Sequence, residues 1–205
     1  MGRARDIANV LSSSTNIALD SELALIQITP TSVATTGGSA TISSSGGISF
    51  TSASAVNLNG CFTSSYENYR IVMNLHGTSF ADVQVRLRGA GTDLSGSVYY
   101  NTYQYARSDN NLSGGGNANS SSWQYIMRSS NSSSLKGMSS FDVISPQTLD
   151  TTKLVGQFVY WESSSIVTHM AFSGMANNNL SYDGFTLTPT SGNITGNIKI
   201  YGYRN

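Results

Sequence analysis

Short stretches in which apolar and polar residues alternate recur along this chain, and they constrain its fold more than any other feature. In residues 69–75, large apolar side chains occupy every second position, and in residues 82–88 valine and leucine alternate with charged or amide side chains. Side chains of a β-strand point alternately to its two faces, so this pattern predicts strands that are buried on one side. Further candidate strands are Leu23 to Ile28, Val98 to Ala106, Trp123 to Arg128, Ser139 to Ile144, Lys153 to Trp161, Ile166 to Phe172, Phe185 to Thr188 and Ile194 to Tyr203.

Loops rich in Gly, Asn and Ser separate these stretches, notably Ser108 to Ser122 and Ser129 to Ser134. Eight or nine strands and no convincing helix between residues 61 and 205 predict an all-β fold, a jelly-roll-like β-sandwich. A chain of 205 residues has room for one such sandwich and an appendage. We therefore expect a head domain over residues 61–205, preceded by two shorter segments.

The first of these segments, residues 1–28, is expected to contain a short N-terminal helix that attaches the chain to a partner. Apolar residues recur there at helical spacing behind two arginines, and a serine run at residues 12–14 ends the pattern. A helix of about three turns is marginal in isolation, so a partner surface would stabilise it; the alternative is that it folds back on its own domain. The candidate attachment residues are Arg3, Arg5, Ile7, Val10 and Leu11.

The second segment, residues 29–60, is rich in Ser, Thr, Gly and Ala and reads as a connector. Short β-prone fragments interrupt it at residues 40–42, 48–50 and 55–58. It is either a flexible linker or a slender shaft of short strands completed by neighbouring chains. We favour the shaft, because small β-forming residues alternate there with glycine turns.

Composition excludes several classes of function. Hydrophobic residues make up 39% of the chain, charged residues only 11%, and the net charge is zero. Phosphate binding needs concentrated Lys and Arg, so we expect no nucleic-acid partner. Cys61 stands alone, which precludes an intrachain disulfide or a cysteine metal cage, and we expect it to be a small buried apolar residue. No signal peptide and no run of about 20 apolar residues is visible, so we expect a protein made in a cytoplasm, without membrane insertion.

Residues suited to catalysis are scarce and scattered. The chain has no phosphate-binding loop of the Gly-x-x-x-x-Gly-Lys-Ser/Thr type and no Gly-x-Ser-x-Gly elbow. His76 and His169 are far apart in the sequence, and the acids of residues 67–183 lie singly. Strands could still bring two carboxyl groups to the roughly 5–10 Å that glycoside hydrolysis requires. We expect no enzyme activity, no metal and no cofactor, with a small polysaccharide depolymerase as the least favoured alternative.

The strongest positive feature is a stripe of tyrosines. By strand alternation Tyr99, Tyr103 and Tyr105 share one face with Asn101, and Trp123 is a candidate to join them. Aromatic rings supply contact area, and hydroxyl and amide groups supply direction, as in surfaces that bind sugars or proteins. These residues are therefore candidates for receptor or subunit contacts. The alternative is that half of the rings fill the core of the sandwich or a subunit interface.

Several stretches of the chain carry a resemblance to known proteins. They are the opening Met1-Gly-Arg-Ala-Arg-Asp-Ile-Ala-Asn-Val-Leu-Ser-Ser-Ser14, Phe62-Thr-Ser-Ser-Tyr-Glu-Asn-Tyr-Arg-Ile-Val72, Val85-Arg-Leu-Arg88, Gly184-Phe-Thr-Leu187 and Gly196-Asn-Ile-Lys-Ile-Tyr-Gly-Tyr203. In these the chain resembles tail-fibre-like virion structural proteins of phages that infect cyanobacteria and other aquatic bacteria. The resemblance implies an N-terminal segment attached to the particle, a β-domain that projects outward, and localisation in the virion.

Three functions follow as hypotheses. The leading one is a tail-fibre or spike-like adhesion protein, bound to other virion proteins by its N-terminus and presenting the sandwich to a host surface glycan or protein. The second is a capsid decoration or cement protein, and the third is the depolymerase. If the resemblance holds, a homotrimer is expected, because three intertwined copies would cover the strand edges of the Ser/Thr/Gly segment.

Overall fold

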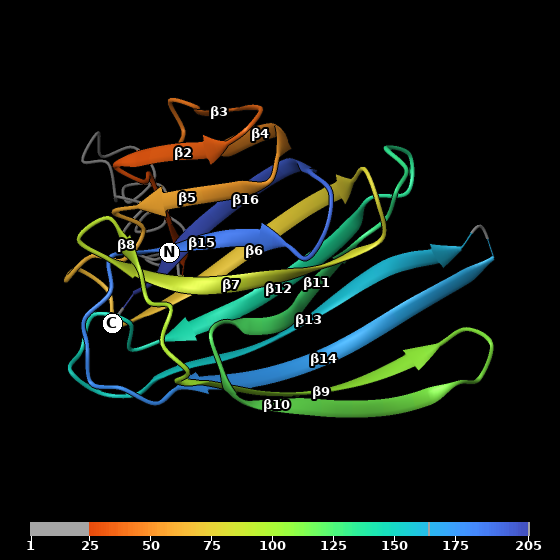
Figure 1. The fold of residues 1–205 in the computed structure, drawn as a ribbon. Helices are drawn as coiled ribbons and strands as arrows, with labels where there is room; N and C mark the ends of the chain where they lie inside the picture. The colour runs from red at the N-terminus through yellow and green to blue at the C-terminus, as the bar shows by residue number, and fades with distance from the viewer. Residues whose placement is uncertain (1–24, 164, 205) are drawn as a thin grey trace, which may run out of the picture.

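The computed structural model describes residues 25–163 and 165–204, in which sixteen strands and no helix are found. The strands form two antiparallel sheets (Figure 1). The larger runs in the order β10 (Leu112–Ser120), β9 (Tyr99–Arg107), β14 (Ile166–Ala176), β13 (Thr152–Ser163), β12 (Gly137–Ile144), β6 (Asn68–Gly77), β16 (Ile194–Tyr203), β4 (Ile48–Ala53) and β3 (Ser39–Ile42), and β1 (Leu25–Ile28) also pairs with β16. The smaller runs β11 (Trp123–Ser129), β7 (Ala81–Gly89), β15 (Gly184–Pro189), β5 (Ala55–Asn59) and β2 (Ser32–Thr36), and β8 (Thr92–Asp93) pairs with β7.

The all-β prediction is confirmed, and each alternating stretch of the sequence is a strand. One prediction is wrong, because β10 lies inside the expected loop from Ser108 to Ser122. Its residues are small and polar and lie at the surface, so no alternation marks them. They become a strand because the backbone of β10 pairs with β9 along the sheet edge, for example Gly114 with Gln104. The expected N-terminal helix and the attachment residues Arg3, Arg5, Ile7, Val10 and Leu11 lie outside the described residues.

Residues 29–60, expected to form a connector or shaft, supply strands to both sheets. β2 and β5 pair with each other in the smaller sheet, while β3 and β4 extend the larger sheet from β16. Ile48, Phe50, Val56 and Leu58 are at most 2% exposed and belong to the common core. Each of these strands therefore has a partner within the chain itself, and β2 and β3 lie at sheet edges.

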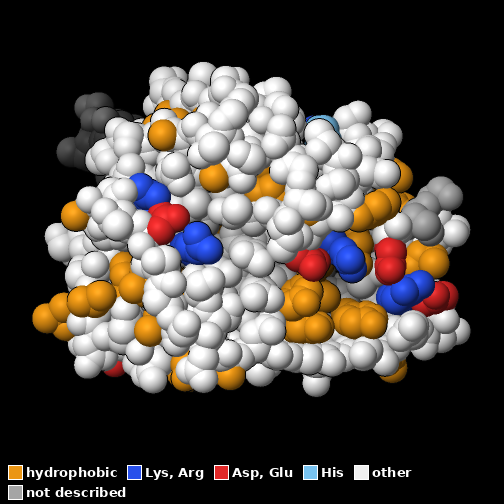
Figure 2. Space-filling model, in the orientation of Figure 1, with side chains coloured by type: hydrophobic (Ala, Val, Ile, Leu, Met, Phe, Trp, Pro, Cys, Tyr) orange, Lys and Arg blue, Asp and Glu red, His pale blue; other side chains and the backbone are white. Residues whose placement is uncertain are grey.

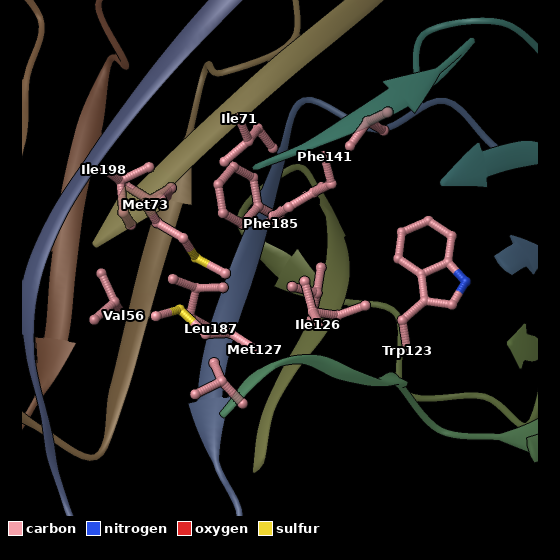
Figure 3. Packing of buried hydrophobic residues seen from close by; sticks show 14 of the residues in the cluster. Val56, Ile71, Met73, Trp123, Ile126, Met127, Phe141, Phe185, Leu187 and Ile198 are labelled. Carbon is pink, nitrogen blue, oxygen red and sulfur yellow. The ribbon is translucent and has the colours of Figure 1, made fainter. Parts of the chain in front are cut away.

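The core lies between the two sheets and is built from their inward-facing side chains. Figure 3 shows Ile71, Met73 and Phe141 packed toward Phe185 and Leu187. Each buried side chain of this size contributes about 1.5–3 kcal/mol relative to an exposed one. Cys61 is confirmed as a buried apolar residue, and its burial raises the pKa of its thiol.

Two long segments enlarge one side of the larger sheet. The chain between β7 and β11 supplies β9 and β10, and the chain between β12 and β15 supplies β13 and β14. In the sheet these become four neighbouring strands, β13, β14, β9 and β10, which continue beyond β12 (Figure 1). We call this four-stranded part the extension. On its inner face β11 contacts β13, β14 and β9, while its outer face turns away from the smaller sheet.

Candidate binding surface on the inner face of the extension

The predicted tyrosine stripe lies on β9, in the middle of the extension. β9 pairs with β14 on one side and with β10 on the other. Its odd-numbered side chains from Tyr99 to Arg107 are at least partly buried, and its side chains at 102, 104 and 106 are exposed. The alternation predicted from the sequence is thus present, with the tyrosines on the inner face.

Tyr99 and Trp123 are core residues. Both are 0% exposed, and their rings meet edge to face with centroids 5.3 Å apart. The Tyr99 hydroxyl donates a hydrogen bond to the carbonyl of Leu94 and accepts one from the amide of Leu87, at 3.0 and 2.9 Å. Burial raises the pKa of Tyr99. For Tyr99 and Trp123 the alternative interpretation therefore holds, in which half of the rings fill the core.

Tyr103 and Tyr105 lie farther along β9, where cover by the smaller sheet is partial. Both are partly buried, and Tyr103 contacts Tyr125 of β11 with ring centroids 4.6 Å apart. Gly115 pairs with Tyr103 across the sheet, and a side chain at Gly115 would meet the Tyr103 hydroxyl at 2.8 Å. The bare backbone of β10 thus leaves room for the ring of Tyr103. Burial, and then the neighbouring Tyr125, raise the pKa of Tyr103.

An ionic cluster closes the far end of this tyrosine surface. Arg107 binds Asp109 through two hydrogen bonds of 3.1 and 2.8 Å, and it donates a third to Glu162 at 3.1 Å. The buried Thr168 hydroxyl donates to the other oxygen of Glu162 at 3.0 Å. These bonds tie β13 and β14 to the end of β9. The two hydrogen bonds to Asp109 also fix the orientation of the planar Arg107 guanidinium.

A second arginine reaches the same place from β11. The Nε of Arg128 lies 3.4 Å from Asp82, and its Nη1 donates to the Tyr160 hydroxyl at 3.4 Å. The guanidinium lies 5.9 Å from the centroid of the Tyr160 ring, within the range of a cation–π contact. Burial raises the pKa of Asp82, although the Arg128 charge opposes this shift.

Between these groups lies a small cavity of about 80 Å³, lined by Tyr105, Arg107, Arg128, Tyr160, Glu162, Thr168 and Met170. We call the cavity together with Tyr103 and Tyr125 the tyrosine pocket. Figure 2 shows positive and negative side chains alternating beside a hydrophobic area on the right of the molecule. The space corresponds to two or three water molecules, which suits a hydroxymethyl or acetamido group better than a whole sugar ring. Guanidinium donors, carboxylate and hydroxyl acceptors and ring faces together suit a ligand that carries both hydroxyl groups and C–H faces.

The structure brings together acids that the sequence showed only singly, since Asp109 and Glu162 share the Arg107 guanidinium. Its hydrogen bonds to Arg107 lower the pKa of Asp109, which is the opposite of what a general acid requires. His169 faces outward from β14, and its Nε2 lies 3.1 Å from Gln157. Within residues 25–163 and 165–204, no group of three or more His, Cys, Asp or Glu side chains could hold a metal ion.

Sequence reasoning did not find the ionic half of this surface. Glu162, Arg107 and Arg128 come from three strands and meet only because β9 pairs with β14 and β11 crosses them. The spacing of these residues along the chain does not predict that their side chains lie close together. The tyrosines could be found because they share a strand, so their common face follows from alternation alone.

No protein-family model and no curated protein sequence matches the chain. Among the described residues, no helix is long and apolar enough to span a membrane.

Proposed function

We propose that this chain is a virion structural protein of the tail-fibre or spike type, which adheres to a host surface through its β-domain. The sequence resemblance to phage virion proteins supports the proposal. The strand order supports it as well, since β4-β16-β6-β12 facing β5-β15-β7-β11 is the order of an eight-stranded jelly roll. Viral capsid proteins and lectins use this fold, which is an argument by analogy of fold.

The observation that carries the adhesion role is the tyrosine pocket. Tyr103, Tyr105 and Tyr125 lie outside the fully buried core, next to two arginines whose side chains are held by carboxylates. Rigid rings and pre-oriented polar groups lose little conformational freedom on binding, so they favour recognition. The proposed ligand is a host surface glycan or protein, bound without cleavage.

The proposed role divides the chain into two functions. Within residues 1–28, the part that precedes β1 binds other virion proteins, and the two-sheet body, which includes β1, faces the host. Three copies assemble into a homotrimer, which would cover the strand edges of the sheets. The chain is localised in the virion. Its proposed role involves no metal and no cofactor.

The virion role is tested in purified particles of the phage that carries the gene. Mass spectrometry of these particles should detect the chain in tens of copies, whereas a cement protein would occur in hundreds. Deletion of residues 1–20 should abolish incorporation and leave the circular dichroism of the body unchanged. Absence of the chain from particles contradicts the virion role, and incorporation of the truncated chain contradicts the attachment role of residues 1–20.

Adhesion is tested with the purified, fluorescently labelled chain and host cells. Tyr105→Ala should weaken cell binding at least tenfold, because the ring forms a wall of the pocket. Tyr201→Ala is the matched control, since Tyr201 lies on the outer face of β16 and lines no part of the pocket. Equal binding by both variants and the wild type contradicts the pocket. Release of sugar from host polysaccharide by the wild-type chain, abolished by Glu162→Gln, favours the depolymerase instead.

A further inference from the structure

The outer face of the extension carries a trough. Three adjoining hollows of about 500, 370 and 310 Å³ run across β10, β9, β14, β13, β12 and β6. Val155 borders all three, and Thr102 and Ser173 border two of them. The hollows are therefore one continuous depression on the side of the sheet opposite the tyrosine pocket.

The pairing of the strands explains why the trough exists. In register, Gly116, Thr102, Ser173 and Val155 stand side by side on four neighbouring strands, and the row continues with Asp142 and Arg70. The next row contains Gly114, Gln104 and Ala171, and most of these side chains are short. Larger side chains, including Tyr100, Met175 and Lys153, form a row along the other side. Small residues in register thus make the floor and longer ones make a wall.

The charges on the trough indicate what it can bind. Its charged side chains are Lys153 and the pair Arg70 and Asp142, which compensate each other through hydrogen bonds of 2.9 Å. Such a lining does not attract a polyanion, because a polyanion needs several unpaired cations. It does not attract a polycation either. The occupant that matches this trough is uncharged.

The distribution of apolar groups indicates which kind of uncharged ligand fits the trough. Val155 and Met175 are 47% and 45% exposed, which is unusual for large apolar side chains in the middle of a sheet. In its row Val155 lies between Ser173 and Asp142, whereas Met175 lies between Tyr100 and Lys153 and shares a hollow with Val155 and Ile144. The trough thus offers C–H surface at Val155, Met175 and Ile144 next to the hydroxyl and amide groups of Thr102, Ser173 and Gln104. Sugar rings carry the same two kinds of group, C–H faces and hydroxyl groups.

The depression crosses the strands rather than following one of them. From β10 to β6 it spans five strand spacings, or about 24 Å at ~4.8 Å per spacing. The side-chain amide of Gln104 is exposed, makes no hydrogen bond within the described residues and lines the trough. A short linear chain of sugar units fits such a length better than a single monosaccharide does.

We propose that this trough binds a neutral oligosaccharide that lies across the strands of the extension. The site is separate from the tyrosine pocket, on the opposite face of the same four strands. It does not depend on the virion role, because any neutral glycan that reaches this face would fit it.

The test uses the full chain and uncharged linear hexasaccharides of glucose, mannose, galactose and N-acetylglucosamine, with a hexasaccharide of a uronic acid as the charged comparison. Titration calorimetry should detect binding of at least one neutral hexasaccharide. Affinity should rise from disaccharide to longer chains and level off once the chain spans the trough. Ala171→Trp, which fills the floor at an exposed position, should weaken binding at least tenfold.

Asn197→Trp is the matched control, because Asn197 is exposed on the outer face of β16 and lines none of the three hollows. This variant should bind within twofold of the wild type, and Tyr105→Ala should do so as well, since Tyr105 faces the other side. The proposal is overturned if no neutral hexasaccharide binds at millimolar concentration, or if only the uronic acid binds. Undiminished binding by a folded Ala171→Trp variant also overturns it, as does a dimer in solution that this substitution dissociates.

Discussion

At the scale of single residues, the fold depends on places where a side chain is missing. Gly174 faces the core from β14, and a Cβ built there would lie 2.9 Å from two atoms of the Trp123 indole and 2.6 Å from the carbonyl of Tyr100. The indole and the strand backbone can approach this closely only because position 174 has no side chain. The sequence offered no reason to single out Gly174 among 20 glycines.

Gly174→Ala should therefore destabilise the protein. The added methyl group overpacks the site, and overpacking of a core typically costs about 1–3 kcal/mol. Urea unfolding measures the loss, and a change in tryptophan fluorescence reports the displacement of Trp123. Gly96→Ala is the control, because its Cβ would meet only Val98, at an ordinary 3.8 Å. Equal stability of the two variants would contradict this account of the packing.

A second residue-scale prediction concerns Cys61 and alkaline pH. Burial holds the thiol protonated in the folded chain, whereas in the unfolded chain it ionises around its ordinary value of 9.0. Above that pH the unfolded chain releases a proton that the folded chain keeps, so the free energy of unfolding falls as pH rises. The contribution of Cys61 is fully present below pH 9.0 and decreases by up to about 1.4 kcal/mol per pH unit above it.

Urea unfolding at pH 8, 9 and 10, in the presence of a reducing agent, measures this effect. The comparison is with Cys61→Ala, which keeps the ionising tyrosines but lacks the thiol. The wild type should lose stability more steeply than the variant above pH 9.0. Parallel curves for the two proteins would show that the thiol does not titrate on unfolding.

At the scale of elements, the sheet order ranks the strands by how well they are held. β6 and β16 lie inside the larger sheet with neighbours on both sides, and most of their inward-facing side chains are fully buried. Among the described strands, β10 pairs only with β9, and nearly all of its side chains are exposed. Its carboxyl end is further interrupted by a shift in register between Asn117 and Ser120.

Hydrogen exchange should reveal this difference. Amides of residues 112–120 should exchange at least a hundredfold faster than those of residues 68–77, because edge strands with little buried apolar surface open locally. Mass spectrometry of peptic peptides from the exchanged chain gives the two rates. Similar protection of both strands would mean that β10 is covered, for example by another copy of the chain.

The elements also show what alternation can and cannot predict. It predicts β6, β7 and β9, because in each strand one face is more deeply buried than the other. It fails for β10, whose position is set by backbone pairing while its side chains lie at the surface. For residues 29–60 the sequence indicated short strands at 40–42, 48–50 and 55–58, but it did not predict that their partners would be strands of the same chain.

At the scale of the whole molecule, each described strand pairs with another strand of the same chain, and β10 and β3 lie at the edges of the larger sheet. The proposed homotrimer would cover such edges, since unpaired strand edges invite pairing with another chain. Light scattering coupled to size exclusion should give a mass of three 21.8 kDa chains at micromolar concentration. A clean monomer under these conditions would count against the trimer, and the chain without residues 1–24 shows whether those residues are needed for it.

The sequence by itself determined the all-β class, the strands that bury one face, and the low charge of the chain. Alternation sets which side chains share a face, and low charge sets which ligands are excluded; both are local properties of the chain. Only the tertiary structure decided which faces meet water. Pairing of β9 with β14, two strands more than 50 residues apart, placed Tyr99 in the core and Tyr105 in a pocket, and it aligned the small residues of the trough. The physical reason is that burial depends on the neighbouring strand and the opposing sheet, and the chain reaches both only by folding.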